Sequence, residues 1–254
     1  MEQVPLWRHV IFVDWHGVLS CDPFWTSIRN NEKHPLRRQL EIKIGEVFAN
    51  ASAHEWMRGK ISSLDVISNM ELWLDRRFRE DFLVRRLYSD CARMRVNVEL
   101  LQVLRAFKSQ AIVVLATDNM DCFSRTFDQA RSRCRRPTSE SETLADWAVI
   151  CDDIICSSDV GALKADNPAG FFGPWLSECG LGFPDALLID DRADNCDAFR
   201  EQGGSAVKWK MGKNDISEVI KSADHWLRSS SKLTSAGRDR IPHRASTGGG
   251  QSSA

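Results

Sequence analysis

The stretch "VIFVDWHGVL" at residues 10–19 decides how the rest of the chain is interpreted. Its first four residues are apolar and mostly β-branched, which favours a strand buried on both faces of a parallel sheet. Asp14 follows this strand directly, and His16 stands two residues later. The question is what a carboxylate does at the end of a buried strand, with an imidazole close behind it.

Similar apolar runs recur along the chain and alternate with helical patterns. We expect strands at 111–117, 153–158, 186–191 and 205–209, and helices over 97–108, 167–178, 194–202 and 215–227. Asn167 followed by Pro168 is typical of a helix start. Strands that alternate with helices predict an α/β fold with a doubly wound, parallel, Rossmann-like sheet.

Residues 20–96 interrupt this alternation, because every pattern in them is helical, at about 35–53, 62–75 and 78–93. We therefore expect a smaller all-helical domain at 20–96. It would be inserted into an α/β core made of residues 1–19 and 97–228.

Two other stretches are expected to lie outside the core. Residues 129–150 combine arginine with Ser, Thr and Glu, and we expect surface loop with partial helix there. Residues 229–254 are rich in Ser, Gly, Arg and Thr and poor in large apolar residues. That composition is typical of a disordered tail.

Composition narrows the partners and the location. The 254 residues carry a formal net charge of −1, so we expect neither nucleic acid nor a membrane surface as a partner. No run of about 18 apolar residues occurs, and no secretion signal is recognised. Eight cysteines without a CxxC pair favour reduced, mostly buried thiols and a cytoplasmic location. Nothing in the composition indicates the oligomeric state.

Polar side chains follow four of the expected strands. Asp14 follows the first, Thr117 and Asp118 end the second, Lys164 comes shortly after the third, and Asp190 and Asp191 end the fourth, with Asn195 close behind. In an open α/β sheet, ligands bind outside the carboxyl ends of the strands. We therefore expect these groups to meet at one crevice.

This set of groups suits phosphoryl transfer. A carboxylate such as Asp14 can attack phosphorus, while an ammonium and a hydroxyl, here Lys164 and Thr117, offset the charge of the transferred group. Mg²⁺ prefers oxygen ligands and is commonly held by one or two carboxylates. Asp14 and Asp191 are our candidates for that role.

The order of the motifs resembles that of the haloacid dehalogenase (HAD) superfamily, over about residues 8–228. The first motif is similar to "VIFVDWHGVL" except at His16, the second to "VVLAT" at Thr117, the third to "GALKADNPAGFF" at Lys164, and the fourth to "LLIDDRADN" at Asp190, Asp191 and Asn195. The helical insertion stands where the family places a C1-type cap.

The resemblance implies a role for each matched position. Asp14 would be the nucleophile and a Mg²⁺ ligand, and Asp191 a second ligand. Thr117 and Lys164 would bind the phosphoryl group, Lys164 also neutralising Asp14, and Asp190 and Asn195 would support the loop. Asp118, where many relatives have Asn, would contact the phosphoryl group through its backbone N–H.

His16 is the main departure from the family pattern. Position 16 normally gives its backbone carbonyl to the metal and a carboxylic acid to the leaving oxygen. The carbonyl is independent of the side chain, and imidazole titrates near neutral pH. Three outcomes stay open: His16 as a working acid/base, a slow phosphatase, or a site that binds without turnover.

We expect a Mg²⁺-dependent HAD-like hydrolase, a phosphatase acting on a small phosphorylated metabolite. One alternative is a non-catalytic HAD-like protein that binds a phosphorylated ligand or a protein partner. The other is a haloacid dehalogenase-type hydrolase. Within the insertion, Arg29 and Arg58 are candidates to contact a substrate anion, although no spacing singles them out. Its tryptophans, Trp25, Trp56 and Trp73, are expected in the core of the insertion, with a substrate pocket as the alternative.

Overall fold

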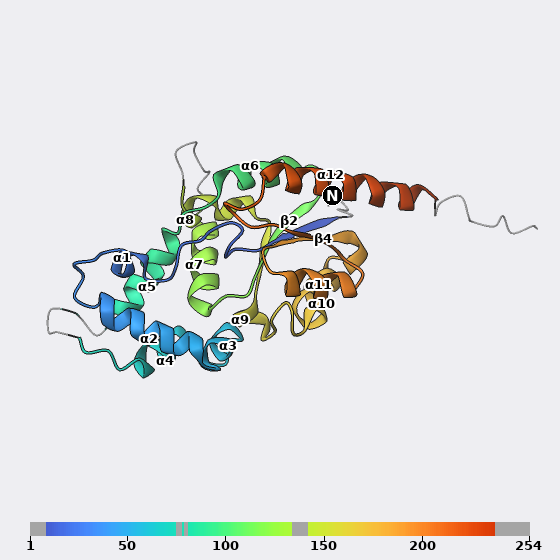
Figure 1. Ribbon diagram of the computed structural model, residues 1–254. Helices are drawn as coiled ribbons and strands as arrows, with labels where there is room; N and C mark the ends of the chain where they lie inside the picture. The colour runs from blue at the N-terminus through green and yellow to red at the C-terminus, as the bar shows by residue number, and fades with distance from the viewer. Residues whose placement is uncertain (1–8, 75–77, 79–80, 134–141, 237–254) are drawn as a thin grey trace, which may run out of the picture.

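Five parallel strands form the central sheet of the computed structural model, which describes residues 9–74, 78, 81–133 and 142–236 (Figure 1). The strands are β1 (Val10–Val13), β2 (Ile112–Thr117), β3 (Asp153–Cys156), β4 (Ala186–Asp190) and β5 (Ser205–Lys208). Their order across the sheet is β3-β2-β1-β4-β5. The prediction of a doubly wound parallel sheet is therefore confirmed.

The register of the strands sets which residues share the carboxyl edge. Val13 pairs with Leu115 on β2 and with Ile189 on β4, and the Asp14 N–H donates to the Ile189 carbonyl at 2.9 Å. The chain order reverses between β1 and β4, which is the point where ligands bind in doubly wound sheets. Asp14 therefore lies at this crevice.

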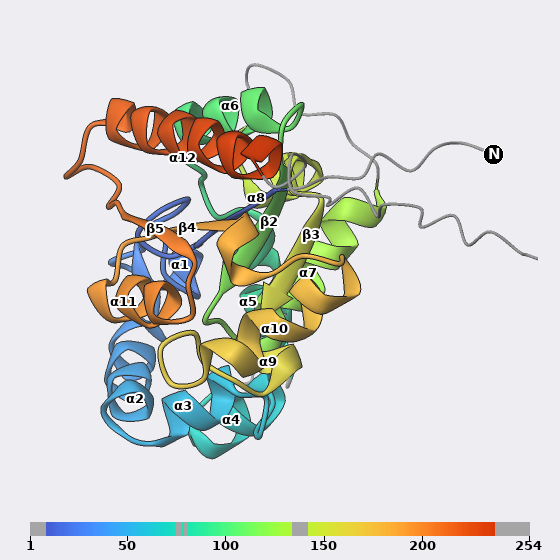
Figure 2. The same ribbon diagram turned by 90° about the vertical axis from the view of Figure 1, so that its right-hand side faces the viewer.

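Helices cover both faces of the sheet (Figures 1 and 2). One face carries α6 (Val98–Phe107), α7 (Asp121–Ser132), α8 (Leu144–Trp147) with the short η1 (Ala148–Ile150), and α12 (Ile216–Ala236). The other carries α10 (Pro168–Glu178) and α11 (Ala193–Glu201). The remaining short turns of the core are α9 (Ser157–Val160) and η2 (Phe183–Asp185). Side chains alternate along β1 accordingly: Ile11 and Val13 face the first layer, Val10 and Phe12 the second.

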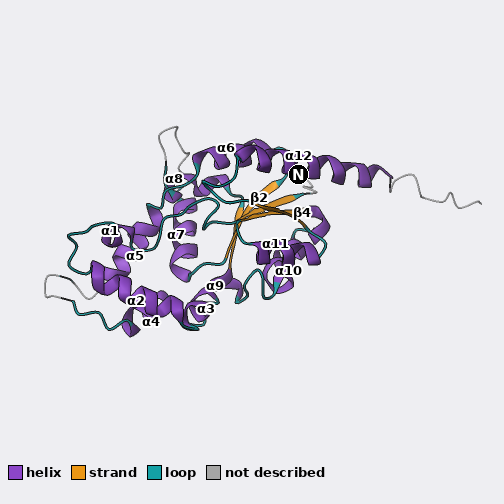
Figure 3. Ribbon diagram, in the orientation of Figure 1, coloured by secondary structure: helices purple, strands orange, loops and turns teal. Residues whose placement is uncertain are grey.

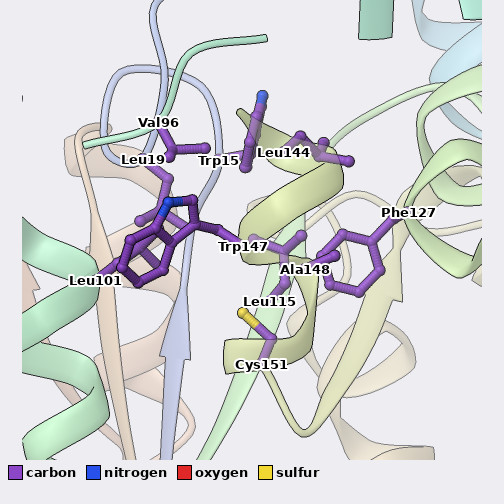
Figure 4. Close-up of a pocket in the computed structure, with 10 residues that line it drawn as sticks. All are labelled: Trp15, Leu19, Val96, Leu101, Leu115, Phe127, Leu144, Trp147, Ala148 and Cys151. Atoms are coloured by element: carbon purple, nitrogen blue, oxygen red, sulfur yellow. The ribbon is translucent and has the colours of Figure 1, made fainter. Parts of the chain in front are cut away.

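The first layer packs tightly behind the end of β1. Figure 4 shows apolar side chains converging there from the loop after β1, from α6, β2, α7 and α8, around a small apolar cavity. Trp15 and Trp147 are its largest members, and both are buried. Trp15 packs on Phe123 with ring centroids 5.0 Å apart. The residue after Asp14 is thus fixed by the core.

Five helices form a group of their own beside the sheet, with no strand among the described residues of the group (Figure 3). They are α1 (Thr26–Arg29), α2 (Arg37–Ala49), α3 (Ser52–Met57), α4 (Ser63–Asn69) and α5 (Phe82–Ala92). Ser62 caps α4, since its hydroxyl accepts from the Asp65 N–H. Trp25 and Trp56 are buried as expected, but Trp73 is 72% exposed, so the prediction that it lies in a core is wrong.

Two predicted stretches differ from the structure. The stretch 129–150 is not a surface loop throughout, because Leu144 and Trp147 of α8 are buried in the core; residues 134–141 lie outside the described residues. The predicted tail, 229–254, begins inside a helix, since α12 continues to Ala236, and 237–254 lie outside the described residues. None of the helices in the described part of the chain has the length and apolar character that a membrane crossing requires.

Candidate active site

Lys164 joins two strand ends at the centre of the site. Its Nζ donates to Asp14 Oδ1 at 2.8 Å and to Asp190 Oδ2 at 2.5 Å, and also to the Ala116 carbonyl at 3.2 Å. The side chain is 1% exposed. Burial opposes the charged form, but the surrounding carboxylates outweigh it and raise the pKa of Lys164 above its ordinary value.

Asp190 is fully used by the protein. Besides Lys164, it accepts from the Asn195 side-chain amide, 3.1 Å from each carboxylate oxygen, and from the Arg192 N–H at 2.9 Å. It is completely buried. These bonds fix the turn after β4, so Asp190 and Asn195 act as supports of the loop that carries Asp191.

Asp14 has one oxygen in use and one to spare. Lys164 binds Oδ1, whereas Oδ2 has no hydrogen-bond partner among the described residues. The residue is 5% exposed. Burial raises the pKa of Asp14 to about 7, against the opposing attraction of Lys164 and with a further increase from the Asp190 charge. A carboxylate held this way gains from any cation that binds beside its unused oxygen.

Asp191 lies across from Asp14 and is less buried. Its Oδ2 accepts from Lys210 Nζ at 2.9 Å. Gly17 stands directly against it with φ +85°, and a Cβ there would lie 2.5 Å from Asp191 Oδ2. Only glycine therefore allows the loop after β1 to approach this carboxylate.

The second strand contributes Thr117 and Asp118. The Thr117 hydroxyl is buried and has no hydrogen-bond partner among the described residues, which is costly unless a ligand supplies one. Asp118 Oδ1 accepts the Lys164 N–H at 3.0 Å, and burial raises the pKa of Asp118. The Asp118 carboxylate thus positions the Lys164 loop.

His16 is exposed and lines the cleft at the carboxyl edge of the sheet. Its ring has no hydrogen-bond partner within the described part of the chain, and no donor there binds its backbone carbonyl. Both the imidazole ring and the backbone carbonyl of His16 are therefore available to a ligand.

The described acidic residues include one group suited to a divalent cation. Asp14, Asp190 and Asp191 each offer a carboxylate oxygen, and these oxygens lie within 4.8 Å of one another. Because Asp190 is saturated by nitrogen donors, Asp14 and Asp191 remain as the candidate ligands. The Asp14 and Asp191 carboxylates and the backbone carbonyl of His16 are oxygen ligands of the kind that Mg²⁺ prefers, so these residues fit this metal.

A single cleft contains these groups. Asp14, His16, Asp118, Lys164, Asp191 and Asn195 all line it, together with apolar side chains from the helical group. Its empty volume is about 1420 Å³, open solvent at its mouth included. Thr117 lies behind this lining, at the end of β2.

The structure also brings in residues that the sequence analysis missed. Lys210 follows β5 and reaches Asp191, and Arg192 lines the cleft while its guanidinium binds Asp194. The signal for Lys210 was its place after the fifth strand, because parallel strands end at one edge. Gly17 was visible only as part of a motif.

Comparisons with known proteins identify the fold. No protein-family model and no curated protein matches the sequence of this chain, whereas solved structures match its backbone. A predicted HAD-like family hydrolase from Porphyromonas gingivalis aligns with a TM-score of 0.60 at 15% identity, over 84% of this chain and 96% of that chain.

Two other matches come from enzymes with bound molecules. A HAD family enzyme from Bacteroides thetaiotaomicron, in complex with magnesium and inorganic phosphate, gives a TM-score of 0.57 at 14% identity over 83% of this chain and 98% of that chain. L-2-haloacid dehalogenase from Xanthobacter autotrophicus, with chloropropionic acid covalently bound, gives 0.52 at 10% identity over 84% of this chain and 80% of that chain. At these identities the likeness concerns the fold.

Proposed function

We propose that this chain, which has the fold of the HAD-family enzymes, is a Mg²⁺-dependent phosphatase that acts on a small phosphorylated metabolite. One observation carries the proposal. Asp14 lies in the cleft with Oδ1 bound to the buried Lys164 and Oδ2 without a hydrogen-bond partner among the described residues. A carboxylate anchored on one oxygen and open on the other is arranged as a nucleophile.

The metal belongs to the proposal because the donor set fits it. Asp14, Asp191 and the His16 carbonyl would hold Mg²⁺, and a magnesium and phosphate complex is known for the Bacteroides thetaiotaomicron enzyme. When bound, Mg²⁺ shields the negative charge of the phosphoryl group, which otherwise repels a carboxylate. Asp190 would stay with Lys164 and Asn195 as a support.

The chain's own residues would then carry out two displacements. Asp14 Oδ2 forms a bond to phosphorus while the ester P–O bond breaks, and the leaving oxygen takes a proton from His16. A water molecule next attacks the phosphorus of the aspartyl-phosphate and passes a proton back to His16. Phosphate leaves and Asp14 is restored. The Thr117 hydroxyl, the Asp118 N–H and Lys164 bind the phosphoryl oxygens throughout.

Residues 20–96 would serve as a cap over this site, with 1–19 and 97–228 as the core. Two contacts support the proposal, since Arg58 forms an ion pair with Asp166 and Gly59 lies against the Ser158 carbonyl. A segment held there keeps bulk water from the phosphoenzyme and contributes to substrate choice.

The test is a panel of phosphate monoesters with Mg²⁺, run on the native protein, on Asp14→Asn and on Asp197→Asn. Asp197 is an exposed residue of α11 outside the cleft and serves as the matched control. We expect Asp14→Asn to lose about 10³-fold or more in turnover and the control to lose nothing. Unchanged turnover in Asp14→Asn would remove this residue from the proposed role.

Carbon–halogen hydrolysis is the second candidate, and the apolar lining of the cleft favours it. Asp14 would form an ester with the substrate carbon and expel halide, a reaction with no use for Mg²⁺. Against it stands the acidic Asp191 beside Asp14. Release of chloride from 2-chloropropionate in EDTA, lost in Asp14→Asn, would establish this reaction instead.

The non-catalytic alternative depends on His16, whose side chain is exposed and unpartnered within the described residues. The variant His16→Asp separates the cases. A loss of about 10²-fold or more in turnover supports His16 as the acid/base. A gain of similar size would mean that the native site binds a phosphorylated ligand with little turnover.

A further inference from the structure

The cleft has two chemically different parts. Its floor consists of groups at the strand ends, including Asp14, Lys164 and Asp191. Its wall comes from the helical group and is mainly apolar, with Phe24, Trp25, Ile44, Phe48 and Met57. Hydrolysis of a phosphate ester uses the floor only. The wall therefore faces whatever the ester carries beyond its phosphoryl group.

Phe48 shows that this wall is not a closed core. Although it lines the cleft, 49% of its surface is exposed, so part of its ring is accessible to a ligand. Trp25, which also belongs to the wall, is buried, with its indole N–H bound to the Leu83 carbonyl at 2.9 Å. The wall thus combines the buried ring of Trp25, which a hydrogen bond holds in place, with the partly exposed ring of Phe48.

Arg29 is the exception in this apolar wall. It is half-buried and lines the cleft, yet its guanidinium forms no hydrogen bond and no ion pair with any described residue. The other cations of the lining are occupied, Lys164 by Asp14 and Asp190, and Arg192 by Asp194. A guanidinium without a partner beside apolar surface is the strongest unused anion site of the cleft.

The backbone holds Arg29 in place by unusual means. Arg29 ends the single turn of α1, and Trp25 directly before this turn has the left-handed conformation with φ 53°, a strained state for a bulky residue. The buried Asp90 carboxylate caps this turn, because it accepts the Ser27 N–H at 3.0 Å and the Ser27 hydroxyl at 2.6 Å. Such strain and support are typical of a positioned functional residue.

Two acidic residues close to this turn or in the same cleft are engaged by other groups. Asp90 is taken by Ser27. Asp22, which also lines the cleft, binds Arg95 through both its backbone N–H at 2.8 Å and its guanidinium at 3.1 Å. The positive charge of Arg29 is therefore available to a ligand.

We propose that Arg29 binds a second anionic group of the substrate. The substrate would be a phosphate monoester whose organic part is apolar beside the phosphoryl group and bears a carboxylate or another anion beyond it. This inference rests on the proposed function, because the floor is taken to bind the phosphoryl group. It names the substrate class, disfavours neutral sugar phosphates, and makes Arg29 the residue that selects among esters.

The test uses phosphonates, which bind without being hydrolysed, so that it does not depend on turnover. Phenylphosphonate and 4-carboxyphenylphosphonate are titrated by calorimetry into the native protein with Mg²⁺, and into Arg29→Met and Arg38→Met. Arg38 is an exposed arginine of α2 outside the cleft, so Arg38→Met is the matched control. Circular dichroism checks that each variant is folded.

We expect the native protein and Arg38→Met to prefer the carboxylated probe by about tenfold, the size of one charge-assisted hydrogen bond. In Arg29→Met we expect that preference to disappear while phenylphosphonate binds as before. Equal binding of the two probes to the native protein would overturn the proposal. So would a loss of affinity for both probes in Arg29→Met, because Arg29 would then bind the phosphoryl group. Failure of both probes to bind the native protein would instead count against the proposed function.

Discussion

The position of Asp14 has two opposing consequences when no metal ion is bound. Its place at the end of a buried strand puts it in the cleft that we propose binds the phosphoryl group, and the same burial raises its pKa to about 7. Lys164 offsets this cost only in part. The ionised Asp14 carboxylate is thus destabilised by burial, and a cation bound beside it would offset that cost. Such a loss of stability is common at functional sites.

The raised pKa predicts that, in EDTA, Asp14→Asn gains stability relative to the native protein as the pH rises. In the unfolded chain an aspartate titrates near pH 4, so between about pH 4 and pH 7 the folded protein keeps a proton that the unfolded chain has lost. The free energy of unfolding contributed by Asp14 therefore falls as pH rises through this window. Urea unfolding at pH 5 and pH 8 should show the variant gaining on the native protein by about 1–4 kcal/mol. A native protein that gains on the variant at pH 8 would contradict the sign.

Gly17 makes a second residue-scale prediction. Gly17→Ala should weaken Mg²⁺ binding, because the new Cβ would lie 2.5 Å from the Asp191 carboxylate. The matched control is Gly161→Ala, since Gly161 has φ +72° but nothing within 4 Å of its Cβ position. Both variants should lose about 1–2 kcal/mol of stability from the left-handed backbone. In calorimetry only Gly17→Ala should lose Mg²⁺ affinity, and equal losses would show that strain, not contact, is responsible.

At the scale of elements, the apolar periods of the sequence predicted the five strands and the helices of the second face. They failed for α7. Its inner surface carries buried Ser124 and Thr126 beside Phe123 and Phe127. Thr126 stays in the core because its hydroxyl donates to the Cys122 carbonyl at 2.7 Å. Such local bonds hide a buried helix face from any count of apolar residues.

The sequence also predicted which residues come together at the site, but not all of the bonds between them. The strand ends identified Asp14, Thr117, Lys164 and Asp190 as neighbours, because parallel strands share one edge. The bond between Lys164 and Asp14 was implied by the resemblance, but the partner of the Asp118 carboxylate was not predictable. The Asp118 side chain turns to the Lys164 N–H, a contact that depends on the path of the loop after β3.

One contact between elements holds the helical segment to the core. Asp121 Oδ1, at the start of α7, accepts the Ser63 N–H at 2.9 Å, the Ser63 hydroxyl at 2.5 Å and the Trp56 indole N–H at 3.1 Å. Asp121→Ala removes the acceptor of both Ser63 donors, which costs about 1–3 kcal/mol. We expect faster hydrogen exchange in 52–69 for this variant, and no change for Asp128→Ala, an exposed residue of the same helix. Faster exchange throughout the sheet instead would mean global destabilisation.

At the scale of the whole molecule, the helical segment touches the core beside the Lys164 loop through the ion pair of Arg58 with Asp166. If this pair helps to hold the helical group over the cleft, Arg58→Glu should lower kcat/KM for a phosphate ester by about 2–5-fold, since exposed pairs contribute little. Adding Asp166→Arg to that variant should restore it. Arg37→Glu, which changes the same charge on α2 away from the cleft, is the control. An uncorrected loss in the double variant would exclude the ion pair as the cause.

The two chain connections between the sheet and the helical group, at about residues 19–22 and 95–97, lie side by side. The Asn97 N–H donates to the Leu19 carbonyl at 2.7 Å, and Arg95 binds Asp22 through backbone and side chain. The segment therefore leaves the sheet and returns to it at one location. Recombination during evolution can therefore replace the whole helical group between these two connections without displacing a strand of the sheet.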